Sequence, residues 1–189
     1  MRELRPTKPL EGVRFILPYG GEDYPEQLMD IPDPPKKIYG IGNPQVLTCG
    51  LSVIGARKAT PYGRDVAFKF AKIASEHGLA IISGGALGCD SAAHRGCLEG
   101  GSPTVVVLGG GCDCIYPESN RDLFQEIIDK GGAVISEHQW QFPPMPYTFR
   151  ARNRIIAGLS RATLIVEAGL PSGTFSTADD ALSSNREVL

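Results

Sequence analysis

The chain has 189 residues, of which 42% are hydrophobic and 21% charged, values near the globular average that exclude general disorder. Lysine and arginine total 19 against 21 acidic residues, so the net charge of −2 excludes a globally basic binder, and a polyanion would have to meet a local patch. The sequence shows no charged-then-apolar leader and no apolar run near the roughly 20 residues of a membrane span. It has five cysteines without an obvious pairing. These features indicate a reduced, cytoplasmic protein without a membrane partner.

Residues 1–50 are expected to form a proline-rich N-terminal extension that packs on the main body and builds no core of its own. Eight prolines between Pro6 and Pro44 keep this stretch extended or turning, with one short helix around residues 24–29. The first 50 residues therefore differ in kind from the rest of the chain.

The remaining residues, 51–189, show short apolar runs that alternate with helical stretches. The runs are rich in valine and isoleucine and are continuous, which is typical of parallel strands buried on both faces. They cover residues 51–56, 79–83, 104–108, 133–136 and 162–167, and residues 187–189 open a sixth. This pattern predicts an α/β fold, a Rossmann-like three-layer sandwich with a mostly parallel sheet and helices on both faces.

Two helices of this body have recognisable ends. Thr60 is an expected N-cap before a helix that closes at His77, and Ser119 with Asp122 resembles a capping box for a helix that ends near Lys130. The apolar face of the first helix is formed by Val66, Phe70 and Ile73. The stripe of the second is Leu123, Phe124, Ile127 and Ile128.

Small-residue loops follow nearly every predicted strand. They are residues 55–57, 83–88, 109–111, 136–137 and 168–174. Because the carboxyl ends of parallel strands meet at one edge of a sheet, we expect all five loops at the same edge, where such folds bind ligands. Glycine lets the backbone approach a phosphate closely and a helix N-terminus favours an anion, whereas tight strand-to-helix turns are the alternative explanation for any single loop.

Known nucleotide signatures are missing from these loops. No G-x-G-x-x-G follows the first strand and no G-x-x-x-x-G-K-[ST] occurs anywhere in the chain. A standard NAD enzyme or P-loop ATPase is therefore not expected, and no cofactor is predicted.

Arginines and aromatic residues indicate what the loop edge binds. Arg57, Lys58 and Arg64 follow the first strand, and four arginines crowd twelve residues without an acid, namely Arg150, Arg152, Arg154 and Arg161. Arg152 leads into the apolar residues 155–157, so at least one arginine is expected to point at the edge and not into solvent. Phe142, Tyr147 and Phe149 precede the cluster and suit stacking on a nucleobase. A single-strand groove and a mononucleotide pocket both fit these residues.

Three residues resemble parts of a hydrolase. Asp90, Ser91 and His94 follow one another closely, but a nucleophilic serine needs its base within hydrogen-bond reach and an orienting acid. On a helix Asp90 and His94 are i,i+4 neighbours, an arrangement that more often fixes local structure, and that interpretation is favoured.

Other titratable residues give weaker signals. Cys112 and Cys114 flank an aspartate, yet zinc needs four ligands and no second pair exists, so no metal site is expected and the cysteines are assigned to core or loop. Glu137 and Glu167 end predicted strands, where they are candidates either for general bases or for holding the arginines in place.

The glycine-rich run at residues 83–94, SGGALGCDSAAH, resembles the SGGA-x-GID-x-x-AH signature of the DprA/Smf family of DNA-processing proteins. The stretch at 149–160 is similar to the family's F-P-x-RNRIIAGLS, and the match runs in order over about residues 24–189. Further matching segments are 53–57 with Thr60 and 62–63, 108–113 with 116–117 and Asn120, 166–168 with 172–174 and 177–178, and the prefix positions 24–25, 33–35, 39 and 42.

The resemblance implies a non-catalytic protein that binds single-stranded DNA and delivers it to the RecA recombinase, as a homodimer, in natural transformation or recombinational repair. Carried over by position, the family's DNA pocket is lined by Arg57, Ser83, Gly84, Gly85, Phe149, Arg152 and Asn153. The predicted site also includes Arg150 and the Gly-Thr phosphate loop, that is Ser172, Gly173 and Thr174. Departures are Cys89 for isoleucine and Arg150 for proline, and the family pattern continues beyond Leu189, so we expect a body truncated at its C-terminus.

Two other functions are compatible with the same fold. Phosphoribohydrolases that act on nucleotides carry Gly-Gly-x-Gly-Thr-x-x-Glu, and Thr177 stands where the catalytic glutamate of that motif would be. A protein that binds or senses a small nucleotide without turnover is the other. No catalytic residue is predicted.

Overall fold

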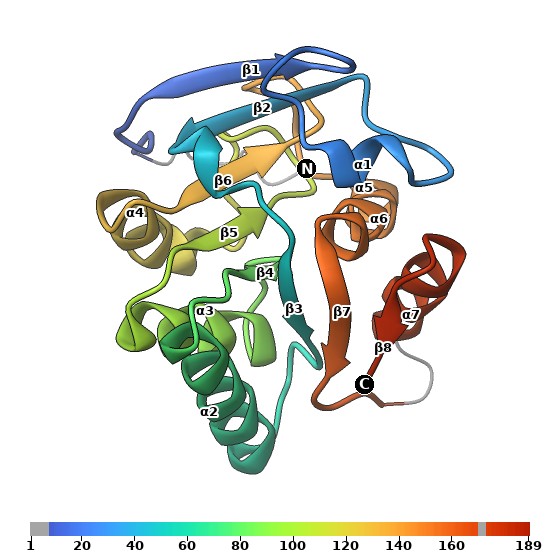
Figure 1. Cartoon of the computed structure of the whole chain (residues 1–189). Coiled ribbons are helices and arrows are strands. Elements are labelled where there is room, and N and C mark those ends of the chain that lie inside the picture. The colour runs from blue at the N-terminus through green and yellow to red at the C-terminus, as the bar shows by residue number, and fades with distance from the viewer. Residues whose placement is uncertain (1–7, 170–172) are drawn as a thin grey trace.

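The structure, a computed structural model, describes residues 8–169 and 173–189, and the strands of this part form a single sheet (Figure 1). The strand order is β1-β2-β6-β5-β4-β3-β7-β8. Neighbouring strands in the order from β6 to β8 pair in parallel. The pairs β1–β2 and β2–β6 are antiparallel. The strands are β1 (Arg14–Pro18), β2 (Lys37–Gly42), β3 (Gly50–Ile54), β4 (Ile81–Ser83), β5 (Thr104–Val107), β6 (Ala133–Ser136), β7 (Ser160–Ile165) and β8 (Glu187–Val188).

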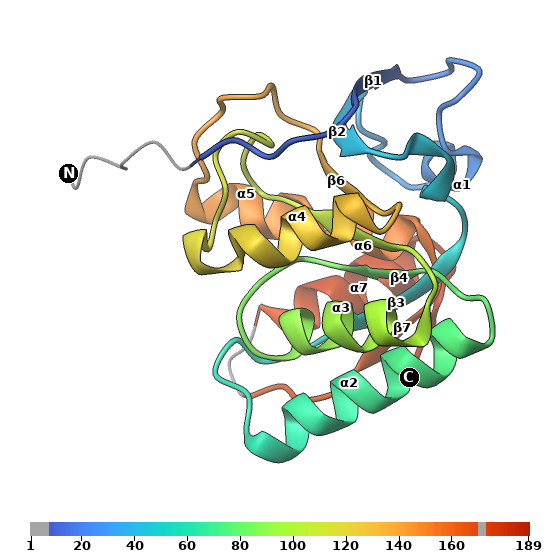
Figure 2. The same ribbon diagram turned by 90° about the vertical axis from the view of Figure 1, so that its left-hand side faces the viewer.

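Helices cover both faces of the sheet. Figure 2 shows α2 (Pro61–Glu76), α3 (Cys89–Gly100) and α4 (Arg121–Asp129) side by side on the near face, with α6 (Asn153–Gly158) and α7 (Thr174–Ser183) behind it. Three further elements are short: α1 (Glu26–Met29), which contacts α6, and the 3-10 turns η1 (Pro44–Val46) and η2 (Glu118–Asn120). The helix α5 (Pro146–Ala151) leads directly into α6. The predicted three-layer α/β fold is confirmed.

The central strands are buried on both faces, as their continuous apolar runs predict. Val105 and Val107 of β5 pack in one core with α1 and α6, and Val106 packs in a second core with α4. All three side chains are fully buried. Removing each from water contributes about 1.5–3 kcal/mol, so β5 stabilises the cores on both faces of the sheet.

The N-terminal region adds two strands to the sheet that the sequence did not predict. Leu17, Leu28 and Ile38 are buried in the same core as α6. Prolines stand at the ends of these strands, with Pro18 closing β1 and Pro35 preceding β2, so they end the hydrogen-bonded ladder without interrupting it.

Helix α2 has the ends that the sequence predicts, but its packing face is different. The Thr60 hydroxyl accepts a hydrogen bond from the backbone of Gly63, and His77 is the C-cap. Phe70 and Ile73 of the predicted apolar face are each 53% exposed. The helix instead packs against α3, where the Ser75 hydroxyl donates to the Cys97 carbonyl. Its buried residues are small; they are Gly63, Ala67, Ala71 and Ser75. Small side chains let two helices approach closely, and that requirement overrides the apolar stripe.

Helix α4 begins later than the expected capping box. Ser119 lies in the turn η2, and Asn120 is the N-cap without a side-chain capping bond, so that prediction was wrong. The Asn120 amide instead donates to the carbonyl of Gly85 and the hydroxyl of Ser91, contacts made over long sequence separation that a local pattern does not reveal. The predicted apolar stripe of α4 is buried. Across residues 8–169 and 173–189, no helix combines the length and the apolar character needed to cross a membrane.

Candidate functional site

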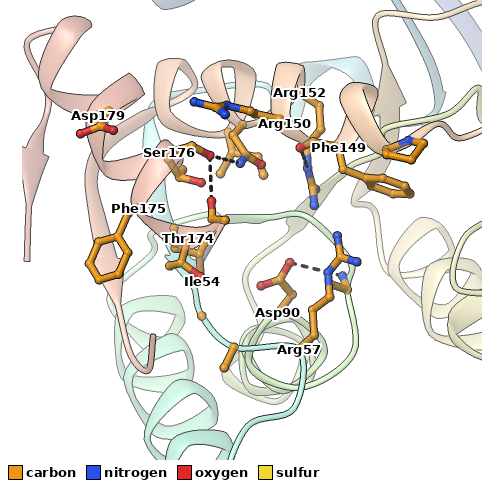
Figure 3. Close-up of a pocket in the computed structure, with 18 residues that line it drawn as sticks. Ile54, Arg57, Asp90, Phe149, Arg150, Arg152, Thr174, Phe175, Ser176 and Asp179 are labelled. Atoms are coloured by element: carbon orange, nitrogen blue, oxygen red, sulfur yellow. Dashed lines mark hydrogen bonds between the residues drawn. The ribbon is translucent and has the colours of Figure 1, made fainter. Parts of the chain in front are cut away.

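A cavity of about 600 Å³ lies beyond the carboxyl ends of β3 and β7 (Figure 3). From β3 the chain adds β4, β5 and β6 on one side and later returns to place β7 on the other. This reversal is the position at which open α/β sheets bind ligands. The cavity lining comes from residues 54–57, from Ala86 and Asp90, from α5 and α6, and from 173–179.

Three arginines line the cavity. Arg57 and Arg150 are exposed, whereas Arg152 is 6% exposed and donates from Nη1 to the Val107 carbonyl at 2.6 Å. Burial lowers the pKa of Arg152 to about 10, and the negative charge of Asp90 opposes that shift. Arg152 therefore remains a cation at neutral pH. The structure thus places a fixed positive charge deep in the cavity and two exposed ones nearer solvent.

Phe149 connects the cavity to a smaller hollow of about 70 Å³. The guanidinium carbon of Arg57 lies 5.2 Å from the Phe149 ring centroid, and the ring of Tyr116 lies 5.4 Å from it on the hollow's side. Of the other expected aromatics, Tyr147 is exposed and does not line the cavity, and Phe142 stacks on the ring of His138 at 4.2 Å. Phe149 is therefore the aromatic platform next to the arginines.

The glycine loop after β4 is held by bonds within the protein. The backbone N–H groups of Gly84 and Ala86 donate to Asp90 Oδ2 at 3.2 and 3.3 Å. The Ser91 hydroxyl donates to the Ala86 carbonyl at 2.6 Å. A side chain at position 84 would collide with the guanidinium of Arg152, so this glycine makes room for the buried arginine.

The remaining predicted residues divide into two groups. Ser83 and Gly85 are buried behind the cavity, where the Ser83 hydroxyl donates to the Val53 carbonyl at 2.7 Å. Asn153, Gly173 and Thr174 line the cavity. Ser172 lies outside the described residues.

Asp90, Ser91 and His94 do not form a catalytic relay. The Thr104 hydroxyl donates to the Ile81 carbonyl, so it accepts from His94 Nδ1 at 2.8 Å and this nitrogen is assigned the proton. Burial, with the nearby charge of Arg152, lowers the pKa of His94 to about 3. Burial raises the pKa of Asp90, and Arg152 and the two loop amides oppose the shift. The three side chains fix local structure, which confirms the favoured interpretation.

Glu137 and Glu167 have different partners. Glu137 accepts from both terminal nitrogens of Arg154 at 2.7 and 2.8 Å, and so holds one of the cluster arginines, which does not line the cavity. Glu167 accepts from the backbone and the hydroxyl of Thr60, the latter at 2.6 Å, at the start of α2. Neither glutamate lines the cavity. Within the described residues no three His, Cys, Asp or Glu side chains are placed to hold a metal.

Sequence reasoning missed the contribution of α7. Phe175, Ser176 and Asp179 line the cavity, and the Ser176 hydroxyl accepts from the Asn153 amide at 2.9 Å. Asp179 follows Phe175 by four residues and Ser176 by three, which places it on the same side of the helix as both, a signal that was available in the sequence. Thr177, also in the lining, is 3% exposed.

Comparison with known proteins gives concordant matches. A family model described as DNA recombination-mediator protein A matches residues 15–189. Protein Smf of Synechocystis sp. is 41% identical over 181 residues, 93% of this chain and 45% of its own length. DNA processing protein DprA of Bacillus subtilis is 34% identical over 95% of this chain and 60% of its own length. The chain spans about half the length of the curated relatives that it matches.

Solved structures agree with the sequence matches. DprA from Streptococcus pneumoniae has a TM-score of 0.84 at 35% identity, covering 92% of this chain and 61% of its own. DprA from Helicobacter pylori, a structure concerned with its single-stranded DNA binding mode, has a TM-score of 0.84 at 32% identity, covering 94% of this chain and 80% of its own. The molybdenum cofactor binding protein of Rippkaea orientalis, 20% identical with a TM-score of 0.54, shares the fold alone.

Proposed function

The chain belongs to the DNA recombination-mediator protein A family, and we propose that its cavity binds single-stranded DNA. The observation that carries this proposal is the gathering of Arg57, Arg150 and Arg152 with Phe149 around one cavity in a protein whose net charge is −2. Guanidinium groups recognise phosphate oxygens, and an aromatic ring offers a stacking surface to any base.

A single strand fits this site better than a duplex. The bases of a duplex are stacked inside the helix, whereas those of a single strand can turn out toward a side chain such as Phe149. The cavity of about 600 Å³ has the size of small-molecule sites, so it accommodates an unstacked nucleotide. The related protein from Helicobacter pylori is described as binding single-stranded DNA, which supports the same ligand here.

The family resemblance supports a wider role. In this proposal the body at 51–189 carries the DNA site, the extension at 1–50 packs on it, and the protein works in the cytoplasm as a homodimer that delivers the strand to the RecA recombinase. It does so without catalysis, and the engagement of Ser91 and His94 in local bonds is consistent with that. DNA strand exchange by RecA on strands coated with single-strand-binding protein, with and without this protein, tests the delivery step.

The DNA site is tested by fluorescence anisotropy with a labelled 20-mer, single-stranded or duplex, across a salt series. We expect the single strand to bind more tightly, with a slope of about −0.7 per neutralised phosphate in log affinity against log salt. Arg57→Ala should weaken binding about tenfold, or about 1.4 kcal/mol, and flatten the slope by about 0.7.

Arg161→Ala is the matched control, because Arg161 is exposed on β7 and does not line the cavity. It should bind like the unmodified protein. Equal affinity for duplex and single strand, or an Arg57→Ala variant that binds normally, would contradict the proposal.

A second candidate ligand is a small nucleotide, favoured by the volume of the cavity, about 600 Å³, and by Gly173 and Thr174 at the start of α7. A rise in melting temperature with AMP, in a protein that binds neither DNA form, would support this ligand instead.

A further inference from the structure

We propose that the Asp90 carboxylate occupies the place beside the Gly84 and Ala86 N–H groups where a phosphate would otherwise bind. The floor of the cavity, formed by Asp90 and Arg152, then accepts an N–H group of a nucleobase and rejects phosphate. The inference rests on the proposed single-stranded DNA binding and deepens it, because it assigns which part of a nucleotide enters the cavity. Asp90 is thereby a specificity-determining residue, and the phosphates belong to the exposed arginines.

The contacts of the glycine loop carry the first step. A loop that leads into a helix N-terminus commonly aims its backbone N–H groups at a phosphate. Here the N–H groups of Gly84 and Ala86 converge on one oxygen, Asp90 Oδ2, and Asp90 comes from the first turn of the twelve-residue helix α3. The chain's own carboxylate therefore sits where a phosphate oxygen would, and the helix dipole favours its charge.

The same contacts make the floor unsuitable for phosphate. A phosphate at this point would find both loop amides already engaged and would meet the negative charge of Asp90. Asp90 is 5% exposed and lines the cavity, so its charge is not shielded by bulk water. Anions are consequently expected at Arg57 and Arg150, which are exposed.

The edge of a nucleobase matches Arg152 and Asp90, the two polar side chains at the floor of the cavity. Arg152 is a hydrogen-bond donor and Asp90 an acceptor, and both line the same cavity (Figure 3). Both loop bonds end on Oδ2. The Ser83 hydroxyl also interacts with the Asp90 carboxylate, but it donates its one proton to the Val53 carbonyl, so we assign Oδ1 to the ligand. Thymine and guanine present a carbonyl next to a ring N–H, which matches a donor beside an acceptor. The carbonyl would accept from Arg152 and the ring N–H would donate to Asp90.

The test compares two single-stranded 20-mers, one of thymidine and one of N3-methylthymidine, by anisotropy at fixed salt. Methylation removes the ring N–H and leaves every phosphate unchanged. We expect the methylated strand to bind about tenfold more weakly with the same salt slope. In Asp90→Asn, whose amide oxygen still accepts from the loop, the difference should fall below about threefold. A difference that persists in a folded Asp90→Asn variant would mean that the added methyl group clashes, and it would overturn the role of Asp90.

A second measurement needs no variant, so it decides the matter if Asp90→Asn does not fold. Inorganic phosphate should displace the thymidine and N3-methylthymidine 20-mers to the same extent relative to chloride at the same ionic strength, because it competes at Arg57 and Arg150, which both strands use. Preferential displacement of the thymidine strand by phosphate, or equal binding of the two strands, would overturn the inference while single-stranded DNA binding stands. If neither strand binds, the proposed function itself fails, and the inference fails with it.

Discussion

The two walls of the cavity differ in how their polar groups are used. On the glycine-loop wall, the N–H groups of Gly84 and Ala86 bond to Asp90, and the Gly85 carbonyl accepts from Asn120. On the arginine wall, Arg57 and Arg150 are exposed at the cavity. On the first wall the backbone groups of the loop are bonded within the protein, whereas the second wall carries exposed positive charge. The glycine-rich loop after β4 therefore serves internal architecture, and the difference between the walls can be measured.

Arg152 joins the two walls, and its removal should have the largest effect. Arg152→Ala takes away the donor to the Val107 carbonyl and the positive charge near the buried carboxylate of Asp90. We expect the free energy of unfolding to fall by about 3–5 kcal/mol, since a buried charge without its counterpart is costly. Urea denaturation at pH 7 measures it.

The matched control is Arg150→Ala, which removes an exposed cavity arginine and should change stability by less than about 0.5 kcal/mol. The double variant Arg152→Met, Asp90→Asn should recover part of the loss, because neither charge is then left alone. An Arg152→Ala protein as stable as Arg150→Ala would mean that the two walls are not coupled.

Low pH should lower the free energy of unfolding through protonation of His94. The pKa of this buried imidazole is lowered to about 3 from an ordinary value of 6.5, so its contribution to stability is complete above pH 6.5 and is lost as the pH falls toward 3. In that window the unfolded chain binds one more proton, and the free energy of unfolding falls by about 1.4 kcal/mol per pH unit, or roughly 3 kcal/mol by pH 4.5.

Two variants separate this effect from other titrations. Between pH 6.5 and 4.5, His94→Gln should remove the His94 contribution to the slope of unfolding free energy against pH. His77→Gln, at an exposed position, should keep that contribution. Asp90 acts in the opposite direction, because its pKa is raised and protonation relieves its burial, so it is the difference between variants that reports His94. Parallel stability curves for His94→Gln and the unmodified protein would contradict the assignment.

Much of this architecture follows from short-range pattern. Continuous apolar runs such as 104–108 predicted strands buried on both faces, because a residue pair like Val105 and Val106 must face opposite layers. The arginine cluster and Phe149 were predicted to lie at the loop edge, and the structure brings Arg57, Arg152 and Phe149 to one cavity.

What the sequence did not indicate depends on contacts between distant segments. The apolar stripe of α2 suggested Phe70 as a packing residue, but close contact with α3 selects small residues such as Ala71 and leaves Phe70 53% exposed. The loop amides were expected to face a ligand, and only the fold shows that Asp90 already occupies them. Periodicity reports which residues are apolar, whereas partner identity requires the packed structure.

The smallest expected effect concerns glycines of the two loops that border the cavity. Gly84→Ala places a methyl group against the guanidinium of Arg152, which is held by the Val107 carbonyl and cannot move freely. We expect a loss of about 1–3 kcal/mol in unfolding free energy, together with weaker DNA binding. At Gly173 no atom of the described residues lies within 4 Å of an added side chain and the backbone φ is −65°, so Gly173→Ala should be neutral to within about 0.5 kcal/mol. Thermal unfolding of the two variants measures this contrast. If both alanines were equally tolerated, Gly84 would not be the residue that makes room for Arg152, and the internal network would be looser than its contacts indicate.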